Sequence, residues 1–118
     1  MRLVVHAAPP AKDGGTSIKS DAHPHFRFVE ALRAAMQAVP EAERFQGADL
    51  VLSMRYERAT SRADALNLIN GVADVIQRRG NAGQAWVIDD DARIREFHYV
   101  ESPGQSDSYV IEVSARDA

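Results

Sequence analysis

The 118-residue sequence contains no cysteine, one tryptophan and no long hydrophobic run. Without cysteine there is no disulfide, no thiolate metal site and no cysteine nucleophile, which is typical of a reducing compartment. The apolar run within MRLVVHAAPP is too short for the hydrophobic region of a signal peptide and far too short to span a membrane. These absences predict a cytoplasmic protein that does not enter the membrane.

An excess of basic charge is also missing, because 14 Lys and Arg residues face 17 Asp and Glu residues, for a formal net charge of -3. Proteins that bind DNA regardless of its sequence usually carry a basic footprint, so this balance counts mildly against a nucleic-acid partner. The sequence also lacks a phosphate-binding glycine loop of the P-loop or dinucleotide type, and no serine has the context of a nucleophile elbow.

The residues that are present predict one domain covering 1–118, since 45% hydrophobic residues and 26% charged residues suit a chain with a single core. Hydrophobic patterning predicts an α+β fold, with a small mixed sheet and two helices in the order β-α-β-α-β-β. The alternating segment ADLVLSMRYER is expected to be the longest and central strand. The stretch ESPGQSD is expected to join the last two strands as a hairpin. Strands are predicted at 2–7, 48–58, 94–100 and 108–114, and helices at 26–39 and 61–80.

The second predicted helix carries two stripes at helical spacing. An apolar stripe is expected to pack on the sheet, and a polar stripe offers carboxylate and amide oxygens, the ligands that Mg²⁺ prefers. The simpler interpretation is that the polar stripe is only a solvated surface. The apolar stripe is Leu66, Ile69, Ala73 and Ile76, and the polar stripe is Asp64, Asn67, Asn70 and Asp74.

Three consecutive aspartates, Asp89, Asp90 and Asp91, stand between two apolar segments in WVIDDDARI. Aspartate is common in turns because its side chain binds nearby backbone amides, and this explains one or two of the three most easily. Three adjacent carboxylates repel one another, and a bound cation would relieve that repulsion. Both interpretations stay open on the sequence alone.

The helix segment ADALNLINGVADVI followed by WVIDDDARI resembles the RusA family of Holliday junction resolvases. The helix motif of that family runs Asp-x-Asp-Asn-Leu-x-Lys-x-x-x-Asp-x-Leu, and an apolar-Asp-Asp-x-x-Ile/Val segment follows it. Pro9-Pro10-Ala11-Lys12 is similar to the Pro-x-Lys stretch of the family, which follows its first strand. Two positions depart from the motif, because Leu66 replaces its second aspartate and Asn70 replaces its lysine. The matching residues are Asp64, Asn67, Leu68, Asp74 and the run Asp90 to Ile94.

The resemblance implies a homodimeric endonuclease that cleaves four-way DNA junctions with Mg²⁺, or with Mn²⁺ in its place. It implies that Asp64, Asp90 and Asp91 are catalytic and that these three, with Asp89, hold the metal. Asp89 is the candidate to compensate for Leu66. Asn67, Asn70 and Asp74 are expected to support the ligands, and Lys12, Lys19, Arg55, Arg58, Arg62 and Arg93 to contact DNA.

Two alternatives to this activity remain. The chain is either a degenerate member of the same fold that binds branched DNA or a protein partner without cleavage, or an unrelated α+β protein whose aspartates only form a turn.

Overall fold

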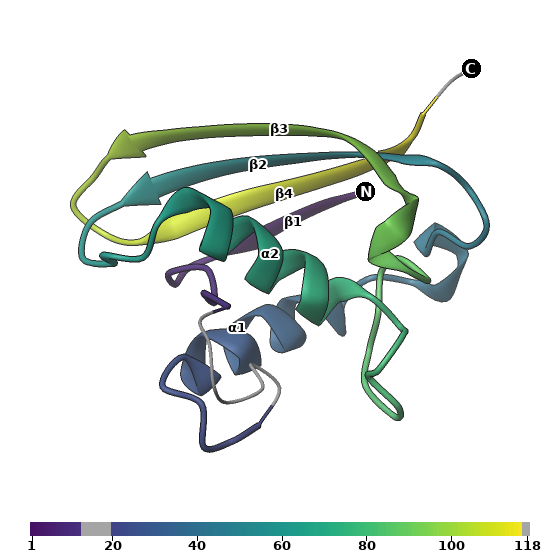
Figure 1. Ribbon diagram of the computed structural model, residues 1–118, viewed down its shortest axis with the longest axis horizontal. Helices are drawn as coiled ribbons and strands as arrows, with labels where there is room; N and C mark the ends of the chain where they lie inside the picture. The colour runs from purple at the N-terminus through teal and green to yellow at the C-terminus, as the bar shows by residue number, and fades with distance from the viewer. Residues whose placement is uncertain (13–19, 117–118) are drawn as a thin grey trace.

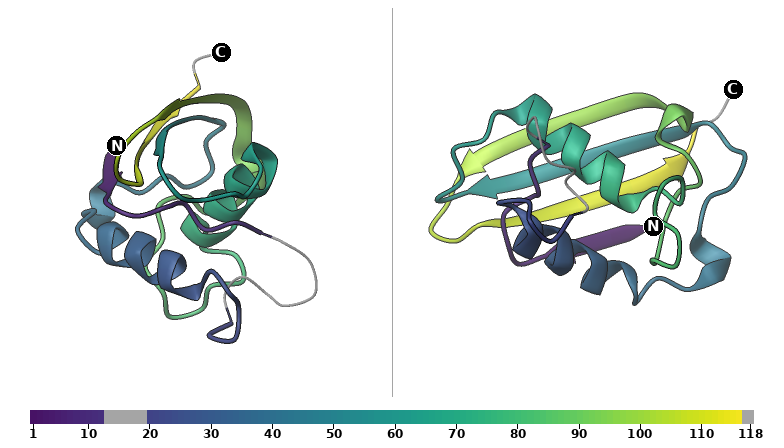
Figure 2. Two further views of the ribbon diagram at one scale, coloured as in Figure 1. Left: turned by 90° about the vertical axis from the view of Figure 1, so that its left-hand side faces the viewer. Right: turned by 60° about the horizontal axis from the view of Figure 1, so that its bottom comes forward.

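A four-stranded mixed sheet and two helices make up the computed structural model, which describes residues 1–12 and 20–116. Both helices lie on one face of the sheet, and the opposite face is open (Figures 1 and 2). The elements follow the predicted order, so the α+β class is confirmed. Their bounds are β1 Arg2–Val5, α1 Phe26–Met36, β2 Leu50–Arg58, α2 Ala65–Ile76, β3 Ile94–Pro103 and β4 Ser108–Ala115, with short 3-10 helices η1 at Glu41–Glu43 and η2 at Asp91–Arg93.

Strand β2 lies inside the sheet, whose order is β1-β4-β2-β3, as its apolar alternation predicted. It pairs antiparallel with β4 and parallel with β3, and β4 pairs antiparallel with β1. Its pairing with β3 extends to Pro103, which makes β3 longer than β2, so the prediction that β2 is the longest strand is wrong. The side chains of β2 that face the helices are all buried, namely Leu50, Leu52, Met54 and Tyr56.

The last two strands do not form the predicted hairpin, because β2 lies between them. The connection after β3 crosses the end of β2, where the Gly104 N–H donates a hydrogen bond to the Arg58 carbonyl at 2.9 Å. A Cβ atom at Gly104 would lie 2.1 Å from Cγ of Glu57, so a larger residue at this crossing would require the exposed Glu57 side chain to move. A short loop can span the roughly 10 Å that separates strands on either side of a third, so the turn signal in ESPGQSD does not decide which strands are neighbours.

Both helices are shorter than predicted. Helix α2 begins after Asp64, whose carboxylate accepts the hydrogen bond of an N-cap, so the predicted start at Ser61 is wrong. It ends before Gln77, whose backbone is extended with ψ at 149°, so Gly80 lies in the following connection and does not cap the helix. Over the described ranges, no helix is long and apolar enough to cross a membrane.

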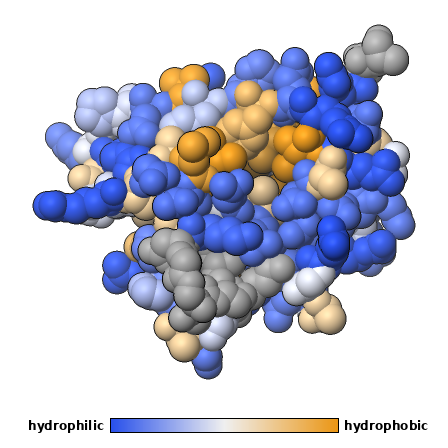
Figure 3. Space-filling model, in the orientation of Figure 1, coloured by the Kyte–Doolittle hydropathy of each residue, from blue (hydrophilic) through white to orange (hydrophobic). Residues whose placement is uncertain are grey.

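The buried face of α2 matches the predicted apolar stripe only in part, because Ala73 and Ile76 are buried. Leu66 is 71% exposed, so the prediction that it packs against the sheet is wrong. The buried face is centred on Leu68, Val72 and Val75, which share the helical spacing of three and four but a different phase. Apolar surface gathers over α2 and the adjoining part of β3 on the side seen in Figure 3. The sheet therefore covers one apolar stripe of α2 and leaves the flank carrying Leu66 in solvent.

Candidate functional site

The first turn of α2 fixes Asp64. Its Oδ1 accepts a hydrogen bond from the backbone N–H of Asn67 at 2.9 Å, and its Oδ2 lies 3.4 Å from the Asn67 amide nitrogen. A carboxylate in this position satisfies a free amide of the first turn and suits the positive end of the helix dipole. The backbone N–H of Lys12 donates to the Asn67 carbonyl at 3.0 Å, which brings the segment after β1 against the same helix.

The last turn of α2 is joined to the aspartate segment by Gln77. The Nε2 of this buried side chain donates to the Asp74 carboxylate at 3.0 Å, and its Oε1 accepts from the backbone N–H of Asp91 at 3.0 Å. Asn81, also buried, donates to the carbonyls of Asp74 and Gln77 at 3.1 and 2.7 Å. One amide side chain therefore holds two aspartates that are 17 positions apart in the sequence.

The three consecutive aspartates have different partners. Asp89 accepts backbone hydrogen bonds from Gly47 at 2.9 Å and from Asp90 at 3.0 Å, one on each carboxylate oxygen. Asp90 accepts the backbone N–H of Ala92 at 2.9 Å and caps the short helix η2. The turn interpretation thus accounts for Asp89 and Asp90. The carboxylate of Asp91 has a different setting, because the charge of Asp74 on α2 and that of Lys12 act on it in addition to the neighbouring Asp90.

The surroundings of Asp90 and Asp91 shift their acidities in opposite directions. The backbone hydrogen bond from Ala92 lowers the pKa of Asp90. Partial burial raises the pKa of Asp91, and the negative charges of Asp90 and Asp74 add to the rise, while the Lys12 ammonium opposes it. Asp91, Asp74, Asp90 and Lys12 therefore act on one another, and an added cation would favour the ionised form of Asp91.

The structure brings Asp91 to Asp74 and does not bring it to Asp64. Asp64 is fixed at the N-cap of α2 and Asp91 at Gln77, and a helix of 12 residues is about 18 Å long. Oxygen ligands of Mg²⁺ lie at about 2.1 Å from the ion, so shared ligands must be close neighbours. Within residues 1–12 and 20–116, no three acidic or histidine side chains form a group that could hold a metal ion.

The two positions that depart from the RusA motif, Leu66 and Asn70, are both exposed on α2. Leu66 has therefore not been absorbed into the core. An apolar side chain faces solvent where the motif carries a carboxylate, and an amide faces solvent where it carries a lysine.

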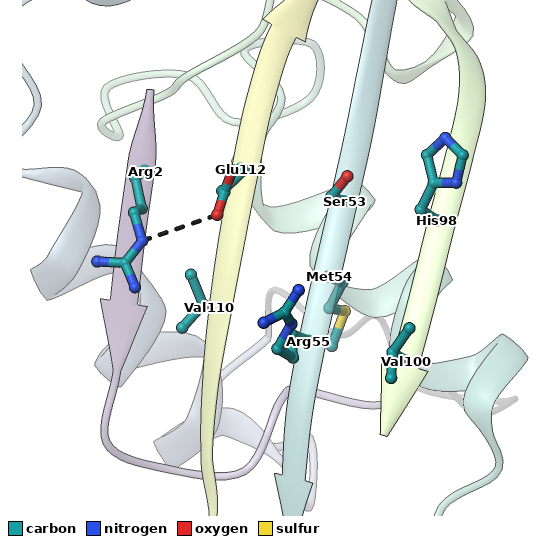
Figure 4. Close-up of a pocket in the computed structure, with 8 residues that line it drawn as sticks. All are labelled: Arg2, Ser53, Met54, Arg55, His98, Val100, Val110 and Glu112. Carbon is teal, nitrogen blue, oxygen red and sulfur yellow. Dashed lines mark ion pairs between the residues drawn. The ribbon is translucent and has the colours of Figure 1, made fainter. Parts of the chain in front are cut away.

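The predicted DNA-binding residues that the structure describes are spread over more than one surface. Arg58 is already bound, because its guanidinium donates to Glu101 at 2.7 and 3.0 Å and to the carbonyls of Ser61 and Ala63 at 2.9 and 2.8 Å. Arg55 lies on the open face of the sheet, away from the helices (Figure 4).

Of the other four predicted DNA-binding residues, the structure describes three, and one of these, Arg62, lies between the two residues whose carbonyls bind Arg58. Arg62 is exposed just before α2, and Arg93 belongs to η2. Lys12 lies beside α2, and Lys19 is outside the described residues.

Sequence reasoning missed Gln77 and the arginines next to it. Gln77 follows the predicted helix stripe without standing out, because its role depends on a contact with the distant Asp91. Arg78 and Arg79 directly follow Gln77 and lie outside α2. The three residues QRR, directly after the last apolar residue of α2, are the available signal for a polar and basic surface there.

Neither a protein-family model nor a curated protein matches this chain. The resemblance to the RusA resolvases therefore depends on the residues of this sequence alone.

Proposed function

We propose that this protein is a Mg²⁺-dependent endonuclease of branched DNA, as its resemblance to the RusA resolvases implies. In this proposal Asp91 and Asp74 are the carboxylates nearest the ion, with Asp90 beside them, and Asp64 serves as the N-cap of α2. The observation that carries the proposal is the Gln77 bridge, which holds Asp74 and the backbone of Asp91 together.

The chemistry of this pair suits a divalent cation. Mg²⁺ is usually bound by one or two carboxylates together with water and substrate phosphate. Partial burial and neighbouring negative charge raise the pKa of Asp91, so a cation at this place would stabilise its ionised form. The ion would polarise a phosphodiester and activate a water for in-line attack. Lys12, whose charge acts on Asp91, would contact the phosphate.

The proposal also includes a homodimer and a cytoplasmic location. A homodimer would place two sites across a symmetric junction, so that paired nicks become available. The absence of cysteine fits a cytoplasmic protein.

A cleavage assay on a synthetic four-way junction tests the proposal. The unmodified protein is expected to nick the junction symmetrically with Mg²⁺ or Mn²⁺. Asp91→Asn and Asp74→Asn should each reduce the rate by about 100-fold, whereas Asp21→Asn, an exposed aspartate before α1, should not change it. Cleavage by Asp91→Asn at the unmodified rate would reject the proposal.

A second function, binding of branched DNA or a protein partner without cleavage, is favoured by Leu66. Its exposed apolar side chain occupies the position where the motif has a metal-binding aspartate. In this case the junction shifts in a gel at low salt and stays intact with either metal.

A further inference from the structure

Four arginines lie on or beside the connection from α2 to β3. This connection, residues 77–93, lies beside the connection from α1 to β2, because Phe45 N–H donates to the Val87 carbonyl at 2.8 Å and Asp89 N–H donates to the Phe45 carbonyl at 3.1 Å. Both connections lie at the end of the molecule opposite the loop that joins β3 to β4 (Figure 1). The arginines are Arg44, Arg78, Arg79 and Arg93.

Trp86, the only tryptophan of the chain, holds two of these arginines. The guanidinium carbons of Arg44 and Arg78 both lie 5.2 Å from the centre of its ring. Cation–π contacts of this kind orient an arginine and reduce the freedom it loses when it binds a ligand. The ring therefore presents Arg78 at the surface in a preferred direction.

The other two arginines, Arg79 and Arg93, project further than the aspartates next to them. The Arg79 side chain is 74% exposed and that of Asp90 is 32% exposed, while Arg93 is 43% exposed and Asp89 is 13% exposed. The nitrogen–oxygen distances in these ion pairs are 3.6 and 3.9 Å, too long for hydrogen bonds. The carboxylates of Asp89 and Asp90 instead accept hydrogen bonds from backbone amides. The outer layer of this surface is therefore cationic. Arg93 Nη1 donates a long hydrogen bond to the Gly47 carbonyl at 3.5 Å, and the other donors of its guanidinium have no hydrogen-bond partner among the described residues.

We infer that Arg78, Arg79 and Arg93 form a binding surface for the phosphates of a DNA strand, with Trp86 in contact with Arg78. They line or adjoin one shallow cleft next to η2, which begins at Asp91. Arginine binds phosphate oxygens with two parallel donors, and phosphate contacts fix the register of DNA on a protein. The inference rests on the proposed function, to which it adds the position of the strand: the strand passes from this surface to Asp91. It also replaces Arg58 as a phosphate contact, since Arg58 is held by Glu101.

The test measures DNA binding without cleavage. A labelled four-way junction is titrated in EDTA at 50 to 200 mM salt, and fluorescence anisotropy gives the affinity. Arg79→Ala/Arg93→Ala is expected to bind about tenfold more weakly at low salt and to reduce the slope of log K against log salt by about 2. Arg79→Ala alone, at the most exposed of these positions, should reduce the slope by about 1 and guards against misfolding of the double variant.

Arg2→Ala is the matched control. Arg2 is 65% exposed and forms an equally long ion pair with Glu112, 3.8 Å, but it lies on β1 at the open face of the sheet (Figure 4). Its removal should leave the affinity and the slope unchanged. In the same titration the emission of Trp86 should change and saturate with the DNA.

The outcomes separate the two proposals. Weaker binding by the arginine variants together with a change in Trp86 emission supports the inference, whether or not the protein cleaves DNA. Unchanged affinity in both arginine variants overturns the inference and leaves the proposed endonuclease intact if cleavage is observed. An unmodified protein that does not bind the junction at 50 mM salt overturns both.

Discussion

The side-chain oxygen of Gln77 accepts a hydrogen bond from the backbone N–H of Asp91 at 3.0 Å. This contact ties the end of α2 to the turn that precedes β3. Because Gln77 is buried and its amide nitrogen is bound to Asp74, the contact has little freedom to vary. It sets where the carboxylate of Asp91 lies relative to α2.

Replacing Gln77 should therefore affect both stability and the proposed activity. Gln77→Met keeps the length of the side chain but leaves the Asp91 N–H and the Asp74 carboxylate without this partner. We expect the free energy of unfolding to fall by about 1–3 kcal/mol, measured by urea denaturation. Cleavage with Mg²⁺ should fall while junction binding in EDTA does not. Gln84→Met, at an exposed glutamine of the same connection, is the control, and equal stability of the two variants would contradict the expectation.

The hydrogen bonds of the Asp107 carboxylate lead us to expect that the protein loses stability in acid. Its carboxylate accepts hydrogen bonds from the Tyr56 hydroxyl at 2.6 Å, from the Thr60 hydroxyl, and from the backbone N–H groups of Ala59 and Thr60 at 2.8 and 3.2 Å. Partial burial alone would raise the pKa of Asp107, but these hydrogen bonds lower it well below its usual range. The folded-state pKa is then below that of the unfolded chain. The stabilisation is present above about pH 4 and is lost as the pH falls below that value.

The corresponding variant is Asp107→Asn. At pH 7 its free energy of unfolding should be lower by about 1.5–3 kcal/mol, because hydrogen bonds to a charged group are lost. Between pH 7 and pH 3 it should lose less stability than the unmodified protein, which urea denaturation at both pH values measures. Parallel losses in the two proteins would show that Asp107 is not the titrating group. Asp21→Asn should follow the unmodified protein.

Two buried tyrosines that face each other across β2 and β4 should respond oppositely to the same substitution. Tyr56 donates its hydroxyl to Asp107, whereas the buried hydroxyl of Tyr109 has no hydrogen-bond partner among the described residues. Tyr56→Phe should cost about 1–2 kcal/mol of unfolding free energy. Tyr109→Phe should be neutral or stabilise by up to about 1 kcal/mol, because an unpaired polar group leaves the core. Thermal unfolding of both variants tests the difference, and a larger loss in Tyr109→Phe would contradict it.

Leu66 should tolerate the aspartate of the RusA motif. Because it is 71% exposed and lies in the first turn of α2, Leu66→Asp should change the unfolding free energy by no more than about 0.5 kcal/mol. Leu68→Ala, at a fully buried position two residues later, should cost about 2–5 kcal/mol. If the motif position contributes to the proposed site, Leu66→Asp also raises the rate of junction cleavage with Mg²⁺. An unchanged rate would mean that this end of α2 does not take part.

Much of the local structure was predictable from the sequence. The alternation of Leu50, Leu52, Met54 and Tyr56 predicted a strand with one buried face, and that strand is central in the sheet. Apolar residues recur every two residues in a strand and every 3.6 in a helix because those side chains face the core. The folded chain therefore shows the same pattern as the sequence. The helix ends were less predictable because they depend on single caps. Asp64 caps α2 through the backbone N–H of Asn67, three positions after the predicted start at Ser61.

The candidate site was only partly predictable. The aspartates Asp89 and Asp90 were expected to form a turn or to bind a cation, and their hydrogen bonds to backbone amides identify the turn. The match of Asp64 and Asp91 to one motif suggested that they are neighbours, whereas Asp91 lies by Asp74 at the other end of α2. The spacing of motif residues along a chain does not determine how far apart two segments lie after folding.

The sequence by itself determined the class of fold, the order of its elements and the set of residues from which a site can be built. Hydrophobic periodicity and turn chemistry are local properties, because they depend on residues that are close together in the sequence. The tertiary structure alone decided that β2 separates β3 from β4, that Leu66 faces solvent, and that Gln77 joins Asp74 to Asp91. Each of these three features depends on which distant segments pack together, and that packing is determined by the free energy of the whole core.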